Sequence, residues 1–249
     1  MECQIQPFES EVAGVSVCKL QLGDFEDPGR AGALDALADG WRRDGVWLVV
    51  CRISDDSDTS LTQLREIGFR PVEALLTLQR DLTGNEQPAE TELAGPGDTD
   101  ACVAVSGEAF TFDRLHRDPQ VPDTLADGIR EAWVRNDLNG RGDACLVART
   151  DGAVSGFNLC LLNGDTAVID LIAVAPAHQG KGIGGQLVAG ALHHYRDRAA
   201  RMQVGTQADN AASIALYAKA GFSIIQSQTT LHWINPDVAP AAPAMGRAQ

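Results

Sequence analysis

The sequence predicts an α/β protein built from two units, and three features predict it. The length of 249 residues is enough for two domains of ordinary size. Short β-branched runs typical of strands alternate with Ala/Leu-rich runs of helical spacing. A glycine-rich segment at residues 175–185 joins the expected strand 166–174 to the expected helix 186–195. Such a loop points unpaired N–H groups and the positive end of a helix dipole at one spot, so we expect it to bind phosphate.

Residues 1–82 form the first predicted domain, a small α/β unit. The patterns indicate strands at 15–20, 46–52 and 74–79 and helices at 31–43 and 59–67, with Asp58 as a candidate cap of the second helix. Residues 83–98 contain turn formers and acids, which favours a linker. A second domain over 99–235 follows, and the Pro/Ala-rich residues 236–249 are expected to be a disordered tail.

The second domain opens with two predicted helices, at residues 100–112 and 122–138. Strands at 144–150 and 153–162 then form a hairpin around Asp151-Gly152, a strong turn signal. A strand at 202–206 follows the glycine-rich loop and its helix, and His232-Trp233 belong to the last strand.

The composition excludes several function classes. The chain has 20 basic and 34 acidic residues and a net charge of −14, so we expect no nucleic acid as partner. The acidic balance suits a cationic amine substrate or general solubility. No signal peptide and no apolar run of about 18 residues is expected, which indicates a cytoplasmic protein that does not enter a membrane.

The six cysteines show no C-x-x-C spacing. We interpret them as small core residues of a protein in a reducing compartment, and not as nucleophiles or metal ligands. No metal is expected.

Three interpretations compete for the glycine-rich loop. Gln179, Gly182 and Gly184 match the Gln-x-x-Gly-x-Gly signature of the GNAT acyltransferases, whereas Gly180, Gly182 and Gly185 match a dinucleotide fingerprint; a tight turn without ligand is the third. The dinucleotide interpretation requires an acid about 20 positions on, and the strand at 202–206 carries none. A Walker A loop is excluded because Lys181 is followed by glycine.

A second motif supports the acyltransferase interpretation. Asn210 stands where a helix is expected to open, and Tyr217 precedes the Gly221-Phe222 turn. Over residues 140–234 the chain therefore resembles the GNAT N-acetyltransferases. The resemblance implies a mixed, mostly antiparallel sheet flanked by helices that binds acetyl-CoA between two splayed strands. The first domain is then a smaller GNAT-like unit without a glycine-rich loop.

The resemblance also implies roles for individual residues. The backbone of Ile172, Ala173 and Val174 would pair with the pantetheine arm of acetyl-CoA. The pyrophosphate would lie on the amides of Gln179, Gly180, Lys181, Gly182, Ile183 and Gly184. Asn210 would bind the pantetheine arm, although it equally suits a helix cap. Tyr217 would protonate the CoA thiolate, unless it is only a packed aromatic. Asp170 or His116 would act as base through water.

A third set of residues concerns the acceptor. Phe112, Arg114, His116, Asp118 and Pro119, followed by Trp133 and Asn136, resemble the dTDP-fucosamine acetyltransferases, which act on dTDP-4-amino-4,6-dideoxygalactose. Leu115 and Asp137 stand where this branch has Phe and Ser. The resemblance implies that Arg114, His116, Trp133 and Asn136 bind the acceptor. The alternative is a solvated loop with Trp133 in the core.

The expected function is transfer of an acetyl group from acetyl-CoA to a primary amine of a small molecule by direct attack in a ternary complex. The alternatives are acetylation of a cationic amine, such as a polyamine, an aminoglycoside or a protein N-terminus, and a non-catalytic acyl-CoA-binding module. The number of chains in the assembly stays open, with a homodimer as one option.

A weak internal repeat links the two halves. Gly68-Phe69 and Thr77-Leu78 match Gly221-Phe222 and Thr230-Leu231 at a constant offset of 153 in the numbering. The first half has no matching glycine-rich loop or tyrosine. We therefore expect one acetyl-CoA site per chain, in residues 140–234.

Overall fold

A computed structural model describes residues 1–22, 30–109 and 113–241 of the chain. Phe112 of the predicted acceptor segment lies outside these residues. The chain divides into two compact units. Unit 1 comprises Met1–Leu75, Asp113–Ile129 and Ser227–Gln249, and unit 2 comprises Leu76–Phe112 and Arg130–Gln226. Because neither unit is one continuous stretch, the domain boundaries expected near residues 82 and 99 stay a prediction.

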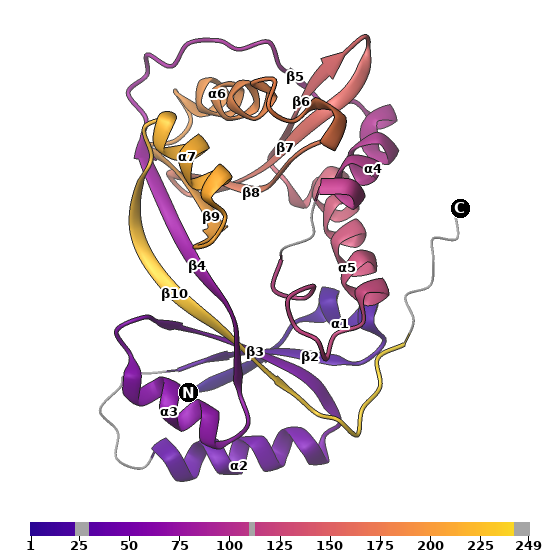
Figure 1. Ribbon diagram of the computed structural model, residues 1–249, viewed down its shortest axis with the longest axis vertical. Helices are drawn as coiled ribbons and strands as arrows, with labels where there is room; N and C mark the ends of the chain where they lie inside the picture. Colours follow the sequence, from indigo (N-terminus) through magenta and orange to yellow (C-terminus); the bar gives the residue numbers. More distant parts are fainter. Residues whose placement is uncertain (23–29, 110–112, 242–249) are drawn as a thin grey trace. The chain divides into compact units, whose positions relative to one another are not determined.

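Unit 1 contains the strand order β1-β2-β3-β10, with mixed pairing. The β1–β2 and β3–β10 pairs are antiparallel and the β2–β3 pair is parallel. Its strands are β1 (Glu2–Ile5), β2 (Ser16–Gln21), β3 (Val46–Ser54) and the end of β10 (Ser223–Ile234), and β4 (Arg70–Asp81) begins here. Its helices are α1 (Pro7–Ala13), α2 (Arg30–Arg43), α3 (Asp58–Glu66) and the start of α5 (Asp123–Asn136) (Figure 1).

An aromatic cluster forms the centre of the unit 1 core. The ring of Trp41 on α2 lies 5.3 Å from that of Trp233 on β10 and 6.0 Å from that of Phe69. The expected cap of α3 is wrong: Ser57 is the N-cap residue, and Asp58 is the first residue of the helix. An acid in the first turn still favours the helix through its dipole, which explains the misplaced signal.

Unit 2 contains the strand order β4-β9-β8-β7-β6-β5. The strands are β5 (Glu92–Leu93), β6 (Ala144–Thr150), β7 (Ala153–Asn163), β8 (Thr166–Val174), β9 (Arg201–Gln207) and the end of β4. Strands β5 to β8 pair antiparallel, and β8 pairs parallel with β9. The expected mixed, mostly antiparallel sheet is therefore confirmed. Asp151 and Gly152 both have positive φ, as the predicted β6–β7 hairpin requires.

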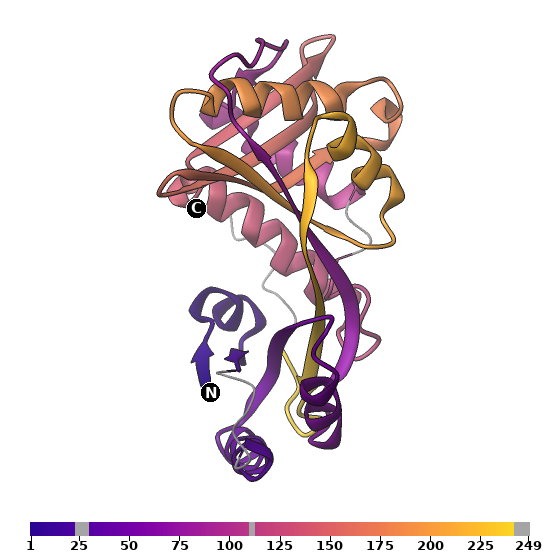
Figure 2. The same ribbon diagram turned by 90° about the vertical axis from the view of Figure 1, so that its left-hand side faces the viewer.

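Helices cover both faces of the unit 2 strands (Figures 1 and 2). On one face, α6 (Ile183–Tyr195) packs Val188, Ala191 and Leu192 against the strands, and α7 (Ala211–Lys219) adds Tyr217. On the other face, Cys102 and Val105 of α4 (Thr99–Ala109) and Val134 at the end of α5 pack together. Alternate strand residues serve the two faces, as the period of two dictates.

The cysteines behave as the sequence predicts. All six are free thiols, and five are buried: Cys18, Cys51, Cys102, Cys145 and Cys160. Burial raises the pKa of the Cys160 thiol, which keeps it protonated and makes it a poor nucleophile.

The internal repeat extends to the boundaries of whole elements. The two ends of α7 lie 153 positions after the two ends of α3. The two ends of β10 likewise lie 153 positions after the two ends of β4. Helix α6 begins 153 positions after the start of α2. Strand β8 ends 153 positions after the end of β2, and β9 ends 153 positions after the end of β3. Gly68 and Gly221 occupy corresponding turns, before β4 and before β10, with φ of +101° and +84°. The successive elements β2, α2, β3, α3 and β4 thus recur in the same order, which supports an internal duplication.

Candidate active site

The central feature of unit 2 is the parting of β8 from β9. Their parallel pairing runs from Thr166↔Arg201 to Ile169↔Val204 and continues no further within the described residues. Strand β8 goes on to Val174, and its other edge stays paired with β7 as far as Gly156↔Val174. The edge that β9 leaves can accept an extended, amide-bearing molecule as an added strand. Ile172, Ala173 and Val174 lie on this free stretch, as expected for a pantetheine arm.

A β-bulge lies where the parting begins. Leu159 pairs with Leu171 and Cys160 with Ile169, so Asp170 is the extra residue of β8. Bulges re-aim side chains and are frequent beside active sites. Here the bulge turns the Asp170 carboxylate toward Arg141, whose Nη1 donates a hydrogen bond of 2.6 Å to Asp170 Oδ2.

The glycine-rich loop connects the free end of β8 to α6. The Gln179 side chain folds back so that Nε2 donates to the Val174 carbonyl at 3.1 Å, which fixes the loop to the strand. Gly180 and Gly182 have φ of +74° and +87°, a region that side chains disfavour. Gly182 is the N-cap residue of α6 and supplies no side-chain cap. The first-turn amides of α6 are therefore available to an anion such as pyrophosphate.

Two residues that the sequence analysis missed hold α6 against the strands. A Cβ added to Gly156 would lie 2.8 Å from the Ala173 carbonyl oxygen and 3.0 Å from a methyl group of Leu187. Asn158, fully buried on β7, donates from Nδ2 to the Leu187 carbonyl at 3.2 Å. A glycine and an asparagine inside an apolar strand are the signals that marked this close approach.

The second motif lies on α7, beside the start of α6. A Cβ on Gly184 would lie 3.3 Å from Cδ2 of Leu216, so the two helices meet at this glycine. Asn210 Oδ1 accepts a hydrogen bond of 3.1 Å from the amide of Ser213. The contact that the structure gives Asn210 is thus that of a helix cap, and the pantetheine role stays a prediction.

Tyr217 is almost fully buried in the cluster that includes Ile169 and Val204 near the end of the β8–β9 pairing. Its ring lies 5.8 Å from that of Phe222. Burial, with a smaller effect of Cys160, raises the pKa of the phenol. The hydroxyl is therefore protonated at neutral pH, as a proton donor must be.

The predicted acceptor residues fall in both units. Arg114 and His116 lie in unit 1, and Trp133 and Asn136 lie on the last turn of α5 in unit 2. Trp133 and Asn136 are half-buried, and their spacing of three places them on one face of the helix.

In unit 1, carboxylates face both loop residues. Arg114 Nη2 donates to Glu9 Oε1 at 2.7 Å. His116 Nδ1 lies 2.7 Å from Asp113 Oδ2 and Nε2 lies 3.2 Å from Asp127 Oδ1. The two carboxylates beside the ring nitrogens fix His116 in its loop, and its role as a base stays a prediction.

Asp118, which also belongs to the motif of the acceptor segment, is buried and structural. It accepts from Arg70 Nη2 at 3.1 Å, from the Gln120 amide at 3.0 Å and from His232 Nδ1 at 2.9 Å. These bonds fix the 113–121 loop to β4 and β10 within unit 1, because a buried carboxylate needs such partners.

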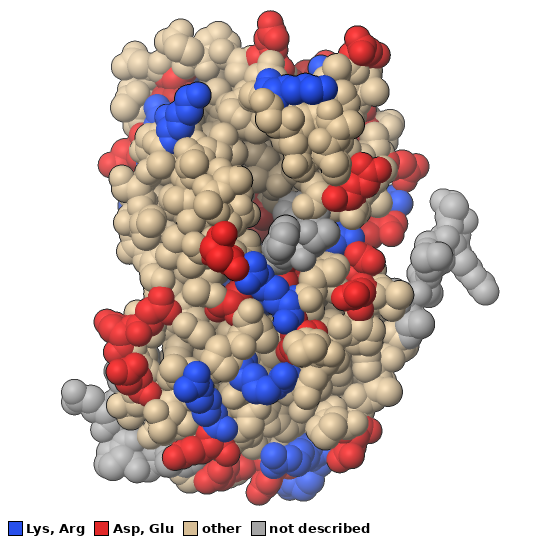
Figure 3. All heavy atoms as spheres, in the orientation of Figure 1, with Lys and Arg blue, Asp and Glu red and all other residues tan. Residues whose placement is uncertain are grey.

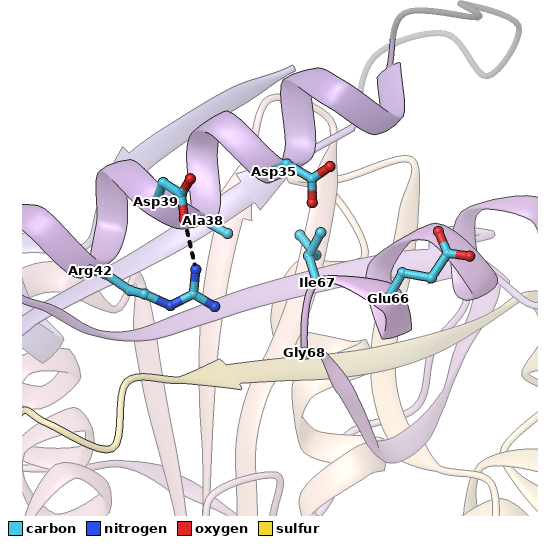
Figure 4. A pocket seen from close by; sticks show the side chains of 7 residues that line it. All are labelled: Asp35, Ala38, Asp39, Arg42, Glu66, Ile67 and Gly68. Atoms are coloured by element: carbon cyan, nitrogen blue, oxygen red, sulfur yellow. Dashed lines mark hydrogen bonds and ion pairs between the residues drawn. The ribbon is translucent and has the colours of Figure 1, made fainter.

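A surface hollow between α2 and the end of α3 is separate from the candidate site (Figure 4). Its wall contains none of the predicted site residues, and Arg42 pairs with Asp39 at 3.0 Å beside it. The lining residues are Asp35, Ala38, Asp39, Arg42, Glu66, Ile67 and Gly68. On the face of the molecule in Figure 3, acidic and basic side chains are mixed, and the described residues form no continuous basic stripe there.

Comparisons with known proteins agree with this geometry. Residues 109–222 match the model of the acetyltransferase (GNAT) family. The spore coat polysaccharide biosynthesis protein SpsD of Bacillus subtilis (strain 168) is 36% identical over 138 residues, which are 55% of this chain and 48% of that protein. A mycothiol acetyltransferase of Mycobacterium sp. (strain JLS) is 26% identical over 210 residues, 79% of this chain and 66% of that enzyme. The chain thus spans about half to two thirds of the length of these relatives.

The fold is likewise that of known acetyltransferases. The crystal structure of a GCN5-related N-acetyltransferase from Sphaerobacter thermophilus superposes with a TM-score of 0.66 at 18% identity, covering 93% of this chain and 76% of that one. The chain therefore has the GNAT fold, and residues 109–222 are the part of it that matches the acetyltransferase (GNAT) family model.

The described residues lack two further features. None of their helices combines the length and apolar character needed to cross a membrane. Over the same part of the chain, His, Cys, Asp and Glu side chains form no group of three that is arranged to hold a metal ion.

Proposed function

We propose that the protein transfers the acetyl group of acetyl-CoA to a primary amine. The observation that carries this proposal is the parting of β8 and β9 beside the uncapped N-terminus of α6. An opening for an amide-bearing arm and a cradle for a pyrophosphate occur together in residues that match an acetyltransferase family.

Each part of acetyl-CoA has a proposed place. The pyrophosphate binds the amides of residues 179–184, and the pantetheine arm pairs with residues 172–174. The N–H group near Val174 polarises the thioester carbonyl and stabilises the oxyanion that forms on attack.

Two side chains move protons in the proposed reaction. Asp170 at the bulge accepts, through water, the proton that the attacking nitrogen loses. Tyr217 donates a proton to the departing CoA thiolate, and its raised pKa keeps that proton in place until the thiolate forms.

The proposed acceptor is the 4-amino group of a dTDP-amino-deoxysugar. The resemblance of residues 112–136 to the dTDP-fucosamine acetyltransferases supports it, as does the similarity to a protein of polysaccharide biosynthesis. Trp133 would meet the base, since indole rings suit stacking.

A second acceptor class follows from the other relatives. The match to a mycothiol acetyltransferase reaches 79% of this chain, more than the 55% matched to SpsD. An acceptor amine like that of the mycothiol acetyltransferases is therefore the second candidate.

The deciding experiment measures CoA release with a panel of acceptors. The panel contains a dTDP-4-amino-sugar, the same nucleotide sugar with a 4-hydroxyl group, a polyamine and the acceptor of the mycothiol acetyltransferases. We expect turnover with the amino sugar and none with its hydroxyl analogue. Faster turnover of another amine would replace the acceptor, whereas acetyl-CoA binding without any turnover would favour a non-catalytic module.

A further inference from the structure

Asp137 is a buried carboxyl group that has no role in the proposed reaction of Asp170 and Tyr217. It opens the turn Asp137–Arg141, which continues directly from α5 and contains two residues with non-helical backbone angles, Asn139 and Gly140 (φ +111°). Turns of this kind commonly end helices. The chain closes tightly around it: the Gly142 amide donates to the Asp137 carbonyl at 3.0 Å, and a Cβ on Gly142 would lie 2.9 Å from that oxygen.

The Asp137 side chain belongs to a cluster of three charged groups. Its Oδ1 accepts a hydrogen bond from Arg141 Nη1, the same nitrogen that donates to Asp170 Oδ2 at 2.6 Å. The Asp137 side chain has 0% exposure, and its second oxygen, Oδ2, has no hydrogen-bond partner among the described residues. Asp170 is partly exposed, at 30%. One guanidinium group thus joins a buried carboxyl to the carboxyl at the β8 bulge.

With both carboxyl groups ionised, this cluster would hold two negative charges against one positive charge. Burial raises the pKa of Asp137 to about 6, the Arg141 contact opposes this, and the charge of Asp170 adds to it. The other ionisable groups nearby are Cys160 on β7, which burial keeps protonated, and Asp143. Asp143 is already bound by Tyr195 Oη at 2.7 Å and Arg198 at 2.8 Å.

We propose that Asp137 is a positioning residue for acetyl transfer: through Arg141 it fixes the Asp170 carboxylate at the bulge, and it forms with Asp170 a carboxyl pair that takes up the proton lost by the acceptor amine. This inference rests on the proposed function of the site. Two carboxyl groups that interact this closely titrate as a pair, so the pair and not Asp170 alone sets the pH at which the base is free.

The proton balance is complete within the named groups. The nitrogen forms its bond to the acetyl carbon and loses one proton, which passes through water to Asp170. The carbon–sulfur bond breaks, and the sulfur takes one proton from Tyr217. Solvent then removes the proton from the carboxyl pair and returns one to Tyr217.

The test compares Asp137→Asn with wild type in kcat against pH. We expect kcat to fall about 10-fold with the KM for acetyl-CoA within about two-fold, because the amide keeps the shape of the side chain but not its charge. The acidic limb of the profile should move to lower pH, since the carboxyl group whose pKa burial raises to about 6 is then absent. Asp165→Asn is the matched control, because Asp165 pairs with Arg201 at 3.0 Å on the surface of the same unit. Asp165→Asn should leave kcat, the KM for acetyl-CoA and the acidic limb of the profile at their wild-type values.

A second test, by NMR, needs no turnover of substrate. Carbon-13 NMR of the aspartate carboxyl groups should show a resonance with a midpoint of about pH 6 that is absent in Asp137→Asn. In Asp170→Asn this midpoint should move to lower pH. If no such resonance exists, the carboxyl pair does not exist and the inference is overturned, even if Asp137→Asn does not fold.

The outcomes separate this inference from the proposed function. If wild type neither binds acetyl-CoA nor acetylates an amine, the proposed function fails and the inference fails with it. If wild type does both and folded Asp137→Asn keeps the wild-type kcat and acidic limb, only the role of Asp137 is overturned.

Discussion

At the scale of single residues, the proposed chemistry depends on the environment of Tyr217. Its phenol is buried in the core cluster that also contains Ile169 and Val204, and burial raises its pKa. A proton donor for a thiolate needs a proton that stays bound until the thiolate forms, and an apolar surrounding provides this. The chain has only two tyrosines, so the other offers a direct comparison.

We predict that Tyr217→Phe lowers kcat by about 10²–10⁴-fold, the range for loss of a general acid, while the KM for acetyl-CoA changes little. Steady-state kinetics against both substrates measures this.

The control is Tyr195→Phe, which removes the hydroxyl that donates to Asp143 at 2.7 Å. It should lower the free energy of unfolding by about 1–3 kcal/mol and leave kcat unchanged. A near-normal kcat in Tyr217→Phe would make that residue a packed aromatic only.

At the scale of elements, the turn between β8 and α6 determines the cofactor site. Gly182 has φ of +87°, a backbone conformation that favours glycine. No described atom lies near its Cβ position, so the absence of a side chain there leaves room for a ligand to approach the backbone. Gly184 differs, because a side chain there would meet Leu216 of α7. Gly182 is therefore the cleaner position at which to test the loop.

We predict that Gly182→Val weakens acetyl-CoA binding by about 100-fold or more, because a branched side chain strains the loop and occupies the place of the pyrophosphate. Isothermal calorimetry measures the affinity. Gly164→Val is the control, since Gly164 also has positive φ (+61°) and open space but lies in the β7–β8 turn. It should lose comparable stability and keep the affinity. Equal affinities in both folded variants would rule out this loop as the cofactor site.

The seating of α6 on β7 gives a stability prediction. Gly156→Ala should lower the free energy of unfolding by about 1–3 kcal/mol. The new Cβ would lie 2.8 Å from the Ala173 carbonyl oxygen of β8 and 3.0 Å from a methyl group of Leu187 on α6. Gly107→Ala in α4, exposed and with nothing near its Cβ position, should raise the free energy of unfolding by about 0.5–1 kcal/mol. Urea titration of both variants checks this. A stable Gly156→Ala would mean that α6 is less closely packed than described.

At the scale of the whole molecule, the repeated elements differ where a cofactor would bind. In unit 1 the strands β2 and β3 stay paired to Leu20↔Cys51, and β2 ends at Gln21. In unit 2 the matching pair ends at Ile169↔Val204, although β8 continues to Val174. The described residues of unit 1 therefore offer no free strand edge of the kind that β8 has.

We predict one acetyl-CoA site per chain. Calorimetric titration of the full chain should give a stoichiometry of one, and Gly182→Val should weaken that single binding event by about 100-fold or more. Two equivalent sites per chain would contradict the assignment of the site to unit 2.

The sequence by itself determined the local parts of this protein. The strand–loop–helix unit and the β6–β7 turn depend on residues that are near one another in the chain, so their patterns predicted them. Periodicity and turn residues likewise predicted most of the helices and strands of both halves, although not β1, α1 or β5, and four matching residues indicated the repeat.

Only the tertiary structure decided the features that depend on register and packing. The bulge that makes Asp170 the extra residue depends on how β7 meets β8, and the parting of β8 from β9 depends on how a whole sheet twists. Asp137 and Asp170 share Arg141 although both strands of the β6–β7 hairpin separate them in the chain, and Asp118 contacts His232 from a distant part of the sequence. Such contacts arise from the sum of many weak long-range interactions, which no short stretch of sequence contains.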